Sequence, residues 1–419
     1  MRKKLILASL MLASSVVRPD SVCSVVSSPG NYIYGADNTG NPTDPNDSLV
    51  CIEVGDVVVD LGGHAFTQDP NNFVGGFSGV VISPNLTNVT IRNGSIRSLT
   101  GKAIIVGEGC TDIRIENIDV STCYDGGIII NGVSINPVKD IVVDNCLVSS
   151  CTGSEASTTY GIRVSNGENI TIKNCTIKGN DGGTVSSGFG ISLEACDSSR
   201  IEDTVAHNNG GNALGVGVSL FQCQWTTVNN CSVFNTIARA VSSRATGLLI
   251  NQSSHTTISN CAVKHTNNSL GEAYGYQLID GSDNLCILCQ SLNNASATIA
   301  SGFYLNGTET KSSLLKCKSR LNDGGVAGVG YGILIDGPQN CDIWYNQVIA
   351  NSGSTGFGLT DTTSNSNNLI VGNLAFQNTT AAYDVTQILP RVFPVANASV
   401  ADFTTISSIS KYINIAFAP

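Results

Sequence analysis

Two aspartates, Asp280 and Asp336, are the residues of this sequence whose types and context could do chemistry. Each stands directly before a glycine, and Asn306 occupies the same context between them. Two carboxylates about 6.5–9.5 Å apart, one on each side of a glycosidic bond, form the active site of an inverting glycoside hydrolase. An Asx-Gly pair is also a common turn signal, and a turn is the simpler interpretation. The pair is therefore a candidate catalytic site only if the fold brings the two side chains together.

Motifs for other chemistries are absent from the sequence. There is no GxSxG nucleophile elbow, and the four histidines are scattered. The Gly-rich stretch "GVGYG" at 328–332 lacks the Lys-Ser/Thr of a phosphate-binding loop. The doublet "CILC" at 286–289 has no second CxxC, so the sequence predicts no metal site and no cofactor.

A repeat must position any site in this chain. The motif of an apolar alternation, an Asn and a Cys, as in "ITIKNCTIKGN" at 170–180, recurs at intervals of 24–30 residues. A fixed period of this length indicates a repeat architecture. The positions equivalent to the cysteine are Gly94, Ile118, Cys146, Cys175, Thr204, Cys231, Cys261, Cys289, Cys317, Asn346 and Asn373.

A second motif recurs with the same period and indicates the type of repeat. It is a glycine followed by a short alternating strand, such as "GISLE" or "GVSLF". The alternation has a period of two and no helical period, which favours parallel strands stacked about 4.8 Å apart, one coil per repeat. The glycines are Gly127, Gly161, Gly190, Gly217, Gly247, Gly275, Gly302 and Gly332.

A ladder of polar residues follows each cysteine position by five residues. An Asn side chain can donate a hydrogen bond to one coil and accept one from the next, and Asn tolerates the left-handed backbone of a sharp corner. We therefore expect these residues to stack at a corner of the coil. They are Cys123, Cys151, Asn180, Asn209, Thr236, Thr266, Asn294, Asn322, Asn351 and Asn378.

These motifs resemble the right-handed parallel β-helix superfamily, in particular the pectate-lyase-like fold and the NosD-type β-helix repeats. The resemblance covers about residues 50–385, and "VVVDLGGHAF" at 57–66 is similar to the first coil after an N-terminal cap. The predicted fold class is all-β, a single-stranded right-handed parallel β-helix of about 11 coils with roughly 28 residues per coil.

The resemblance implies long surfaces that face polysaccharides. Asp280, Asn306 and Asp336 would then share one corner, with the two aspartates two coils, or about 10 Å, apart. Tyr304 and Gln277, on the same strands, would line a groove beside them. The pectin-hydrolase triplets "NTD", "GHG" and "RIK" and the epimerase motif "DPHD" are missing, which weighs against an enzyme. Ca²⁺ would be expected only if the protein were a lyase.

Of the 15 cysteines, those on the ladder (Cys146, Cys175, Cys231, Cys261, Cys289 and Cys317) are expected to be buried thiols. Ladder cysteines in adjacent parallel strands have parallel Cβ directions, which keeps their Cβ atoms farther apart than the roughly 3.8 Å of a disulfide. They would therefore serve as small apolar residues in a tight interior. If bridges form, the favoured pairs are Cys123 with Cys151 and Cys196 with Cys223, where corner geometry is freer.

The ends of the chain suggest export and capping. Residues 1–22, with the basic Arg2-Lys3-Lys4 and an apolar run at 5–17, are typical of a signal peptide. Residues 23–55 are predicted to form an N-terminal cap, 56–385 the β-helix, and 386–419 a C-terminal cap or tail. A secreted, periplasmic or cell-surface location follows from this interpretation.

Composition limits the partners. The net charge of −10 argues against nucleic acid, which requires Lys/Arg patches, and no other segment is apolar enough to span a membrane. We expect an exported protein that presents an elongated surface to glycans or an envelope component. The alternatives are a polysaccharide lyase, epimerase or hydrolase with an atypical site, and a purely structural rod. The oligomeric state is left open.

Overall fold

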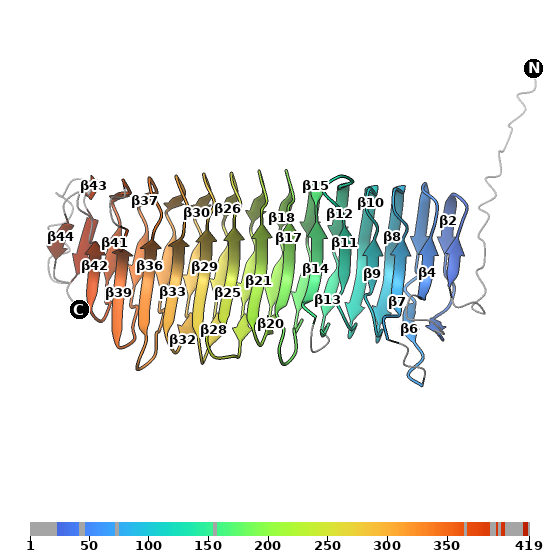
Figure 1. Ribbon diagram of the computed structural model, residues 1–419, viewed down its shortest axis with the longest axis horizontal. Coiled ribbons are helices and arrows are strands. Elements are labelled where there is room, and N and C mark those ends of the chain that lie inside the picture. The colour runs from blue at the N-terminus through green and yellow to red at the C-terminus, as the bar shows by residue number, and fades with distance from the viewer. Residues whose placement is uncertain are drawn as a thin grey trace, which may run out of the picture.

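The computed structural model describes residues 23–41, 47–71, 75–153, 157–363, 367–385, 391–392, 395–398 and 414–417. The predicted signal peptide at 1–22 lies outside these residues. In the described part of the chain the regular elements are all β-strands, stacked along one axis (Figure 1).

One sheet, called sheet A here, runs the length of the molecule with 14 parallel strands. Each strand pairs with its equivalent one coil away. The strands are β1 (Ser24–Val26), β4 (Ser48–Ile52), β7 (Ser78–Ile82), β9 (Ile104–Val106), β11 (Ile128–Asn131), β14 (Thr159–Ser165), β17 (Gly188–Glu194), β21 (Leu214–Phe221), β25 (Arg244–Asn251), β29 (Glu272–Ile279), β33 (Ile299–Asn306), β36 (Val329–Asp336), β39 (Thr355–Asp361) and β42 (Ala381–Val385).

Two further ladders form the opposite wall and are joined where β8 (Thr87–Arg97) and β10 (Thr111–Ser121) run through both. The first ladder comprises β2 (Gly30–Ile33), β5 (Val57–Asp60), β8 (Thr87–Arg97), β10 (Thr111–Ser121), β12 (Val138–Asp144), β15 (Gly167–Lys173), β18 (Arg200–Glu202), β22 (Thr227–Asn229), β26 (Thr257–Ser259), β30 (Leu285–Ile287), β34 (Ser313–Leu315), β37 (Asp342–Trp344), β40 (Leu369–Val371) and β43 (Arg391–Val392).

The second ladder continues from β8 and β10 in the same parallel manner. Besides those two strands it comprises β3 (Asn38–Gly40), β6 (Ala65–Gln68), β13 (Leu147–Ser149), β16 (Thr176–Lys178), β19 (Val205–His207), β23 (Ser232–Phe234), β27 (Ala262–Lys264), β31 (Gln290–Leu292), β35 (Lys318–Arg320), β38 (Gln347–Ile349), β41 (Leu374–Phe376), β44 (Val395–Ala398) and β45 (Asn414–Phe417). A small third sheet holds β20 (Gly210–Gly211), β24 (Ile237–Ala238), β28 (Asn267–Asn268) and β32 (Ala295–Ser296).

The predicted fold class is confirmed. The chain forms an all-β parallel solenoid of about 12 turns with about 28 residues per turn, close to the expected 11. The predicted register also holds, since Gly94 pairs with Ile118, the first two positions of the cysteine ladder. A continuous core of Ile, Val, Leu and Cys side chains fills the coil interior.

The ladders begin within the segment that was predicted as an N-terminal cap. β1 pairs with β4, and β2 pairs with β5, so Ser24 already lies in the first rung. At the other end β43 and β45 pair with β40 and β41, while most of residues 386–419 lies outside the described residues. The boundaries of the two caps stay predictions.

The corners differ from the prediction in one detail. The left-handed residue is not the ladder asparagine but the residue before it: Asn208 has a φ of 55°, and Asn209 follows it with its side chain buried. Asn180 and Asn209 do stack as expected, with Asn180 Nδ2 donating to Asn209 Oδ1 at 3.0 Å. A left-handed residue turns the chain, and the next side chain points inward.

The same rule explains the recurring Asn-Cys pair. Asn174 has a φ of 54°, and the thiol of Cys175 then lies inside the coil, 3.1 Å from the carbonyl oxygen of Lys173. At the equivalent position the Thr204 hydroxyl donates to the Glu202 carbonyl at 2.8 Å. The cysteine is thus more than an apolar filler, because its thiol donates to a carbonyl exposed by the bend.

No disulfide forms along the ladder among the described residues, as predicted, and 13 cysteines there are free and buried. The two pairs that were favoured as bridges, Cys123 with Cys151 and Cys196 with Cys223, are also free thiols, so that prediction was wrong. Their sulfurs instead lie near carbonyl oxygens, as Cys223 Sγ does at 3.3 Å from Leu193. The disulfide that does form joins Cys23 and Cys51, on β1 and β4.

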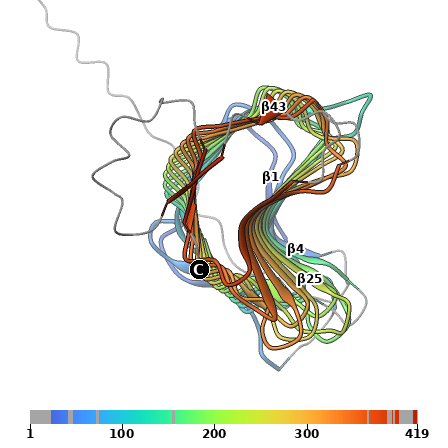
Figure 2. The same cartoon turned by 90° about the vertical axis from the view of Figure 1, so that its left-hand side faces the viewer.

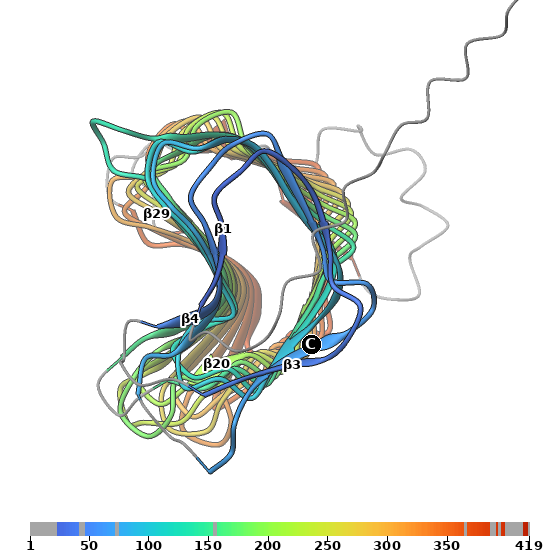
Figure 3. The ribbon, with the colours of Figure 1, turned by 90° about the vertical axis from the view of Figure 1, so that its right-hand side faces the viewer.

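Viewed along its axis, the coil has a concave outline on one side (Figures 2 and 3). The strands of sheet A bend toward the interior there, where the recurring glycine lies. At Gly217 a Cβ atom would collide with the Val233 side chain on the opposite wall and with the backbone of Gly247. The glycine row therefore allows the two walls to approach each other, and the outer face of sheet A becomes concave.

Candidate functional site

One row of outward side chains lies at the centre of this concave face. Its members stand two residues after the recurring glycines, and the register pairs each with the next. We call it the floor row; it consists of Ile129, Arg163, Ser192, Ser219, Leu249, Gln277, Tyr304 and Leu334, and it continues to Thr360, two residues after Gly358.

A pocket opens where the floor row is small. Ser192 and Ser219 occupy neighbouring strands β17 and β21, and a hollow of about 200 Å³ lies over them. We call this part of the face the open segment. Its pocket is lined by Phe189, Ser192, Glu194, Leu214, Ser219, Phe221, Leu249 and Asn251.

The face is filled where the floor row is large. Tyr304 stacks on Tyr274 with ring centroids 4.7 Å apart, and Leu334 packs beside them. Tyr274 is 1% exposed and Tyr304 is 7% exposed, although both lie outside the coil core. Burial raises the pKa of Tyr274 well above its usual range. We call this part, from β29 to β36, the closed segment.

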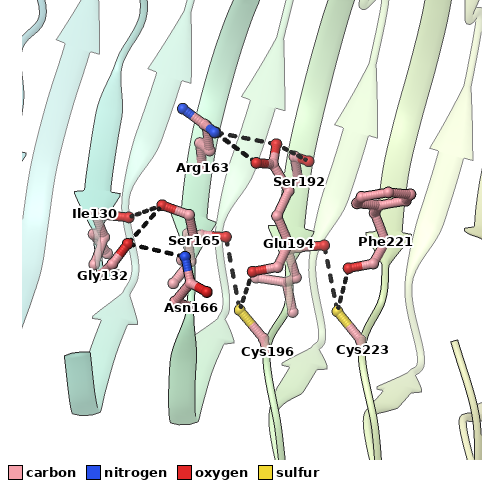
Figure 4. Close-up of polar contacts among 12 residues, drawn as sticks. Ile130, Gly132, Arg163, Ser165, Asn166, Ser192, Glu194, Cys196, Phe221 and Cys223 are labelled. Carbon is pink, nitrogen blue, oxygen red and sulfur yellow. Dashed lines mark hydrogen bonds and ion pairs between the residues drawn. The ribbon is translucent and has the colours of Figure 1, made fainter. Parts of the chain in front are cut away.

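The wall of the pocket is held by an ion pair that Figure 4 shows. Arg163 Nη2 lies 2.6 Å from Glu194 Oε2, and Arg163 Nε lies 3.0 Å from Oε1, so the guanidinium engages both carboxylate oxygens. The hydrogen bonds to Glu194 raise the pKa of Arg163. The guanidinium also lies over the Tyr160 ring at 5.1 Å, and Ser192 donates to Glu194 at 3.2 Å. The carboxylate is thus fixed in position beside the pocket.

Ser219 has the opposite character, because its hydroxyl is available. The residue is 3% exposed and lines the pocket, and its side chain has no hydrogen-bond partner within the described part of the chain. The hydroxyl is not among the buried side-chain atoms that lack a partner, so it is accessible from the pocket. A ligand atom in the pocket could satisfy it.

Four of the five predicted site residues do lie on the concave face. Gln277 pairs with Tyr304 on the floor row, and Asn306 pairs with Asp336 at the edge of the face. Asn306 Nδ2 donates to the Tyr304 hydroxyl, which in turn lies 3.5 Å from Asp336 Oδ2. Burial, with the nearby Asp336 charge, raises the pKa of Tyr304 to about 12. These residues form part of the closed segment, so their side chains fill the face.

Asp280 is not equivalent to Asp336, which corrects the alignment made from the sequence. The register pairs Ile279, not Asp280, with Asn306, so the alignment was shifted by one residue. The cause is local: Asp280 is itself the left-handed corner residue, with a φ of 54°, whereas Asn306 and Asp336 end their strands. Asp280 Oδ1 accepts a 2.8 Å hydrogen bond from the backbone of Thr308 and so serves the turn.

Sequence reasoning missed the residues of the open segment. Ser192 and Ser219 stand in "GISLE" and "GVSLF", which were used only for their glycine rhythm. The available signal was the residue two positions after the glycine, which is serine in two consecutive coils and larger in the others. A small residue repeated in neighbouring coils predicts a hollow on a stacked sheet.

A larger hollow of about 450 Å³ lies at the corner beside the small third sheet. It is lined by amide side chains, such as Asn208 and Asn235, together with His265 and Ile237. Asn235 Nδ2 already donates to Asn208 Oδ1 at 3.0 Å. Within the described residues no group of three or more His, Cys, Asp or Glu side chains could hold a metal ion. We therefore take the open segment, with its ion pair and available hydroxyl, as the candidate site.

Comparison with known proteins supports the fold. The family model described as "Right handed beta helix region" matches residues 46–188 and 78–245. The chain is a right-handed parallel β-helix. This is the β-helix fold that the sequence motifs indicated. No curated protein matches the β-helix by sequence.

Several solved structures are similar to this β-helix. The A-module of the mannuronan C-5 epimerase AlgE6 of Azotobacter vinelandii is 12% identical, with a TM-score of 0.52 over 93% of this chain and 91% of that chain. PfbA, a surface adhesin of Streptococcus pneumoniae, is 10% identical, with a TM-score of 0.50 over 75% and 82% of the two chains. Pectate lyase Pel9A is 14% identical, with a TM-score of 0.45 over 72% and 77%. At these identities the likeness concerns the fold alone.

Helices capable of crossing a membrane are not found among the described residues of the β-helix.

Proposed function

We infer that the β-helix is an exported glycan-binding protein whose ligand lies along the concave face of sheet A, over the open segment. The observation that carries this proposal is the pocket above Ser192 and Ser219. It combines aromatic and aliphatic walls with a fixed carboxylate and an unpartnered hydroxyl. Sites for small polar ligands have this composition, mainly apolar walls with a few placed polar groups.

The concave shape supports a polymer as the ligand. The face continues through neighbouring coils, so a chain that lies along it can meet more than one coil. The fold is shared with a mannuronan epimerase and a surface adhesin, which are proteins named for a polysaccharide and for attachment. The signal-peptide pattern at 1–22 agrees with a role outside the cell.

The number and pairing of the carboxylates favour glycan binding over glycan cleavage. Glu194 is the one acidic residue among the described residues that line the pocket, and Arg163 neutralises it through two hydrogen-bonded nitrogens. A glycoside hydrolase requires two carboxylates, one of which keeps a proton. Asp280 and Asp336 lie outside this pocket, and each already accepts a hydrogen bond from a threonine, Thr308 or Thr362.

A glycan-array screen of the protein tests the proposal, with Ser219→Tyr as the pocket-filling variant. Tyrosine at this position reproduces the closed segment, so we expect binding to fall by more than about tenfold, since the ligand loses its pocket contacts. Ser232→Tyr is the matched control, because Ser232 lies in the same coil on β23, in a different sheet. It should bind as the wild type does.

Two results would contradict the proposal. One is the absence of binding to every glycan on the array, with and without Ca²⁺, which would favour a structural rod. The other is equal binding by wild type and Ser219→Tyr, which would place the ligand elsewhere. A product assay on any bound glycan separates binding from turnover.

A further inference from the structure

The size of the open-segment pocket limits what can enter it. Its volume is about 200 Å³, below the roughly 300–1,000 Å³ typical of pockets that enclose a whole small ligand. A pyranose ring lying along the sheet would therefore place only a substituent inside. The identity of that substituent can be argued from the three kinds of group that line the pocket.

The apolar part of the lining accepts a methyl group. Phe189, Leu214 and Leu249 belong to three consecutive strands, β17, β21 and β25, and all three face the pocket. Phe189 is also held by stacking on Tyr160, with ring centroids 5.2 Å apart. A bare sugar hydroxyl would bury its polar atom against these carbons, whereas a methyl group would remove apolar surface from water.

The polar part of the lining provides one donor and one acceptor. The Ser219 hydroxyl has no partner in the described residues and is free to donate to a carbonyl oxygen. The Glu194 carboxylate accepts three hydrogens, those of Arg163 Nε (shared between both oxygens), Arg163 Nη2 and the Ser192 hydroxyl, against about four acceptor sites in total. It can therefore also accept from an N–H group at the edge of the pocket.

Charge excludes two other classes of substituent. A carboxylate on the sugar would face the Glu194 carboxylate, and the nearest cation, Arg163, already uses Nε and Nη2 on Glu194. Uronic acids are thus disfavoured in this pocket. A free amine would pair with Glu194 but would leave the apolar walls and the Ser219 hydroxyl without a complementary group.

We propose that the open segment recognises the acetamido group of an N-acetylated sugar, with the methyl between Phe189 and the two leucines, the carbonyl oxygen on Ser219 and the N–H on Glu194. This proposal rests on the proposed glycan-binding function and names its ligand class. An O-acetyl group has the methyl and the carbonyl but no N–H, so it satisfies only part of the lining.

The test compares two neutral β-1,4-linked tetramers, one of N-acetylglucosamine and one of glucose, by isothermal titration calorimetry. The two tetramers differ only in that each sugar of the first carries an acetamido group where each sugar of the second carries a hydroxyl. We expect the acetamido tetramer to bind at least about tenfold more tightly. Saturation-transfer NMR should show its strongest signal at the acetyl methyl protons. An array of N-acetylated and O-acetylated glycans extends the comparison to other linkages.

Ser219→Ala separates a specific hydrogen bond from general packing. It should weaken the acetamido tetramer about fivefold, because one hydrogen bond to the carbonyl is lost, and leave glucose binding unchanged. Ser232→Ala is the matched control and should alter neither. The circular dichroism spectrum and midpoint of urea unfolding verify that each variant is folded.

The outcomes distinguish the two proposals. If other glycans bind and acetamido sugars do not, or if both tetramers bind equally, the acetamido proposal is wrong while glycan binding stands. Equal weakening of both tetramers by Ser219→Ala would also overturn it. If no glycan binds at all, the proposed function fails and this inference fails with it.

Discussion

The open and closed segments of sheet A share the same backbone and differ in one row of side chains. In both, a glycine brings the sheet close to the opposite wall, and the residue two positions later faces the concave side. With serine there, a pocket of about 200 Å³ remains. With Tyr304 and Leu334 there, the face becomes a second hydrophobic cluster outside the coil core.

In a stacked sheet the backbone determines the concave shape of the face, and the volume of the side chains determines whether a pocket remains on it. Identical rungs repeat the concavity in each coil, so no change of fold is needed to open or close it. Gln277 lies at the edge of the closed segment, next to Leu249 and Tyr304. It is fully buried, and its Nε2 lacks a hydrogen-bond partner within the described residues.

The largest expected effect comes from opening the closed segment with Tyr304→Ala. Removing a buried aromatic side chain leaves a cavity and costs about 3–5 kcal/mol of unfolding free energy. Urea unfolding followed by circular dichroism measures it. Leu214→Ala in the open segment is the comparison and should cost less, because Leu214 is only half-buried. A loss below about 1 kcal/mol for Tyr304→Ala would show that the aromatic stack does not stabilise the closed segment.

A smaller effect is expected from breaking the ion pair beside the pocket with Arg163→Ala. The variant leaves the Glu194 carboxylate, 23% exposed in the side chain, without its cation, which should cost about 1–2 kcal/mol. Arg244→Ala is the matched control, since Arg244 reaches Glu272 through one 3.2 Å hydrogen bond beside the closed segment. That pair is more exposed and should cost under about 1 kcal/mol. Equal losses would show that the bidentate geometry at Arg163 adds no stability.

Glu309, at the turn after β33, is a carboxylate with no ion-pair partner among the described residues. It accepts from Gly281 N at 2.6 Å, from Asn284 Nδ2 at 2.9 Å and from the Ser312 hydroxyl. Burial is the main cause that raises its pKa above 4.5, while these hydrogen bonds lower it. From about pH 4.5 up to the raised pKa the folded state binds more protons than the unfolded state.

The stability that Glu309 contributes is therefore fully present below about pH 4.5 and is lost as pH rises through the raised pKa. The slope for this one group is at most about 1.4 kcal/mol per pH unit. Urea unfolding between pH 4 and 8 should show that slope in the wild type relative to Glu309→Gln, which does not titrate. Parallel curves for the two proteins would contradict the prediction.

The fold was predictable from the sequence because each short motif, ambiguous by itself, is repeated many times at one period. A single "GVSLF" predicts little, but eight equivalents at one period fix the strands, the register and the inward cysteines. The right-handed parallel β-helix was predicted from the same rows of residues.

The site was predictable only in part, because it depends on the volumes of the side chains on the concave face and on one-residue shifts in the alignment between coils. Asn306 was expected at a corner and Tyr304 in a groove beside it, whereas the contacts show that their side chains fill the concave face. Asp280 was aligned with Asn306 since both precede glycine, but β29 and β33 end at the same rung, with Ile279 opposite Asn306, and the glycine comes one residue later after β29 than after β33. Ser219 was overlooked because serine alone carries no catalytic signature.

The buried thiols provide a way to follow how the coils of the β-helix separate from one another. Cysteine recurs from Cys110 to Cys341, and every free thiol in the described chain is buried. An alkylating reagent in solution can reach such a sulfur only when its coil separates from its neighbours. Because the cysteines occupy known coils, the order in which they become labelled would show which coils open first and which open later. The native cysteines suffice, so none has to be introduced by mutation.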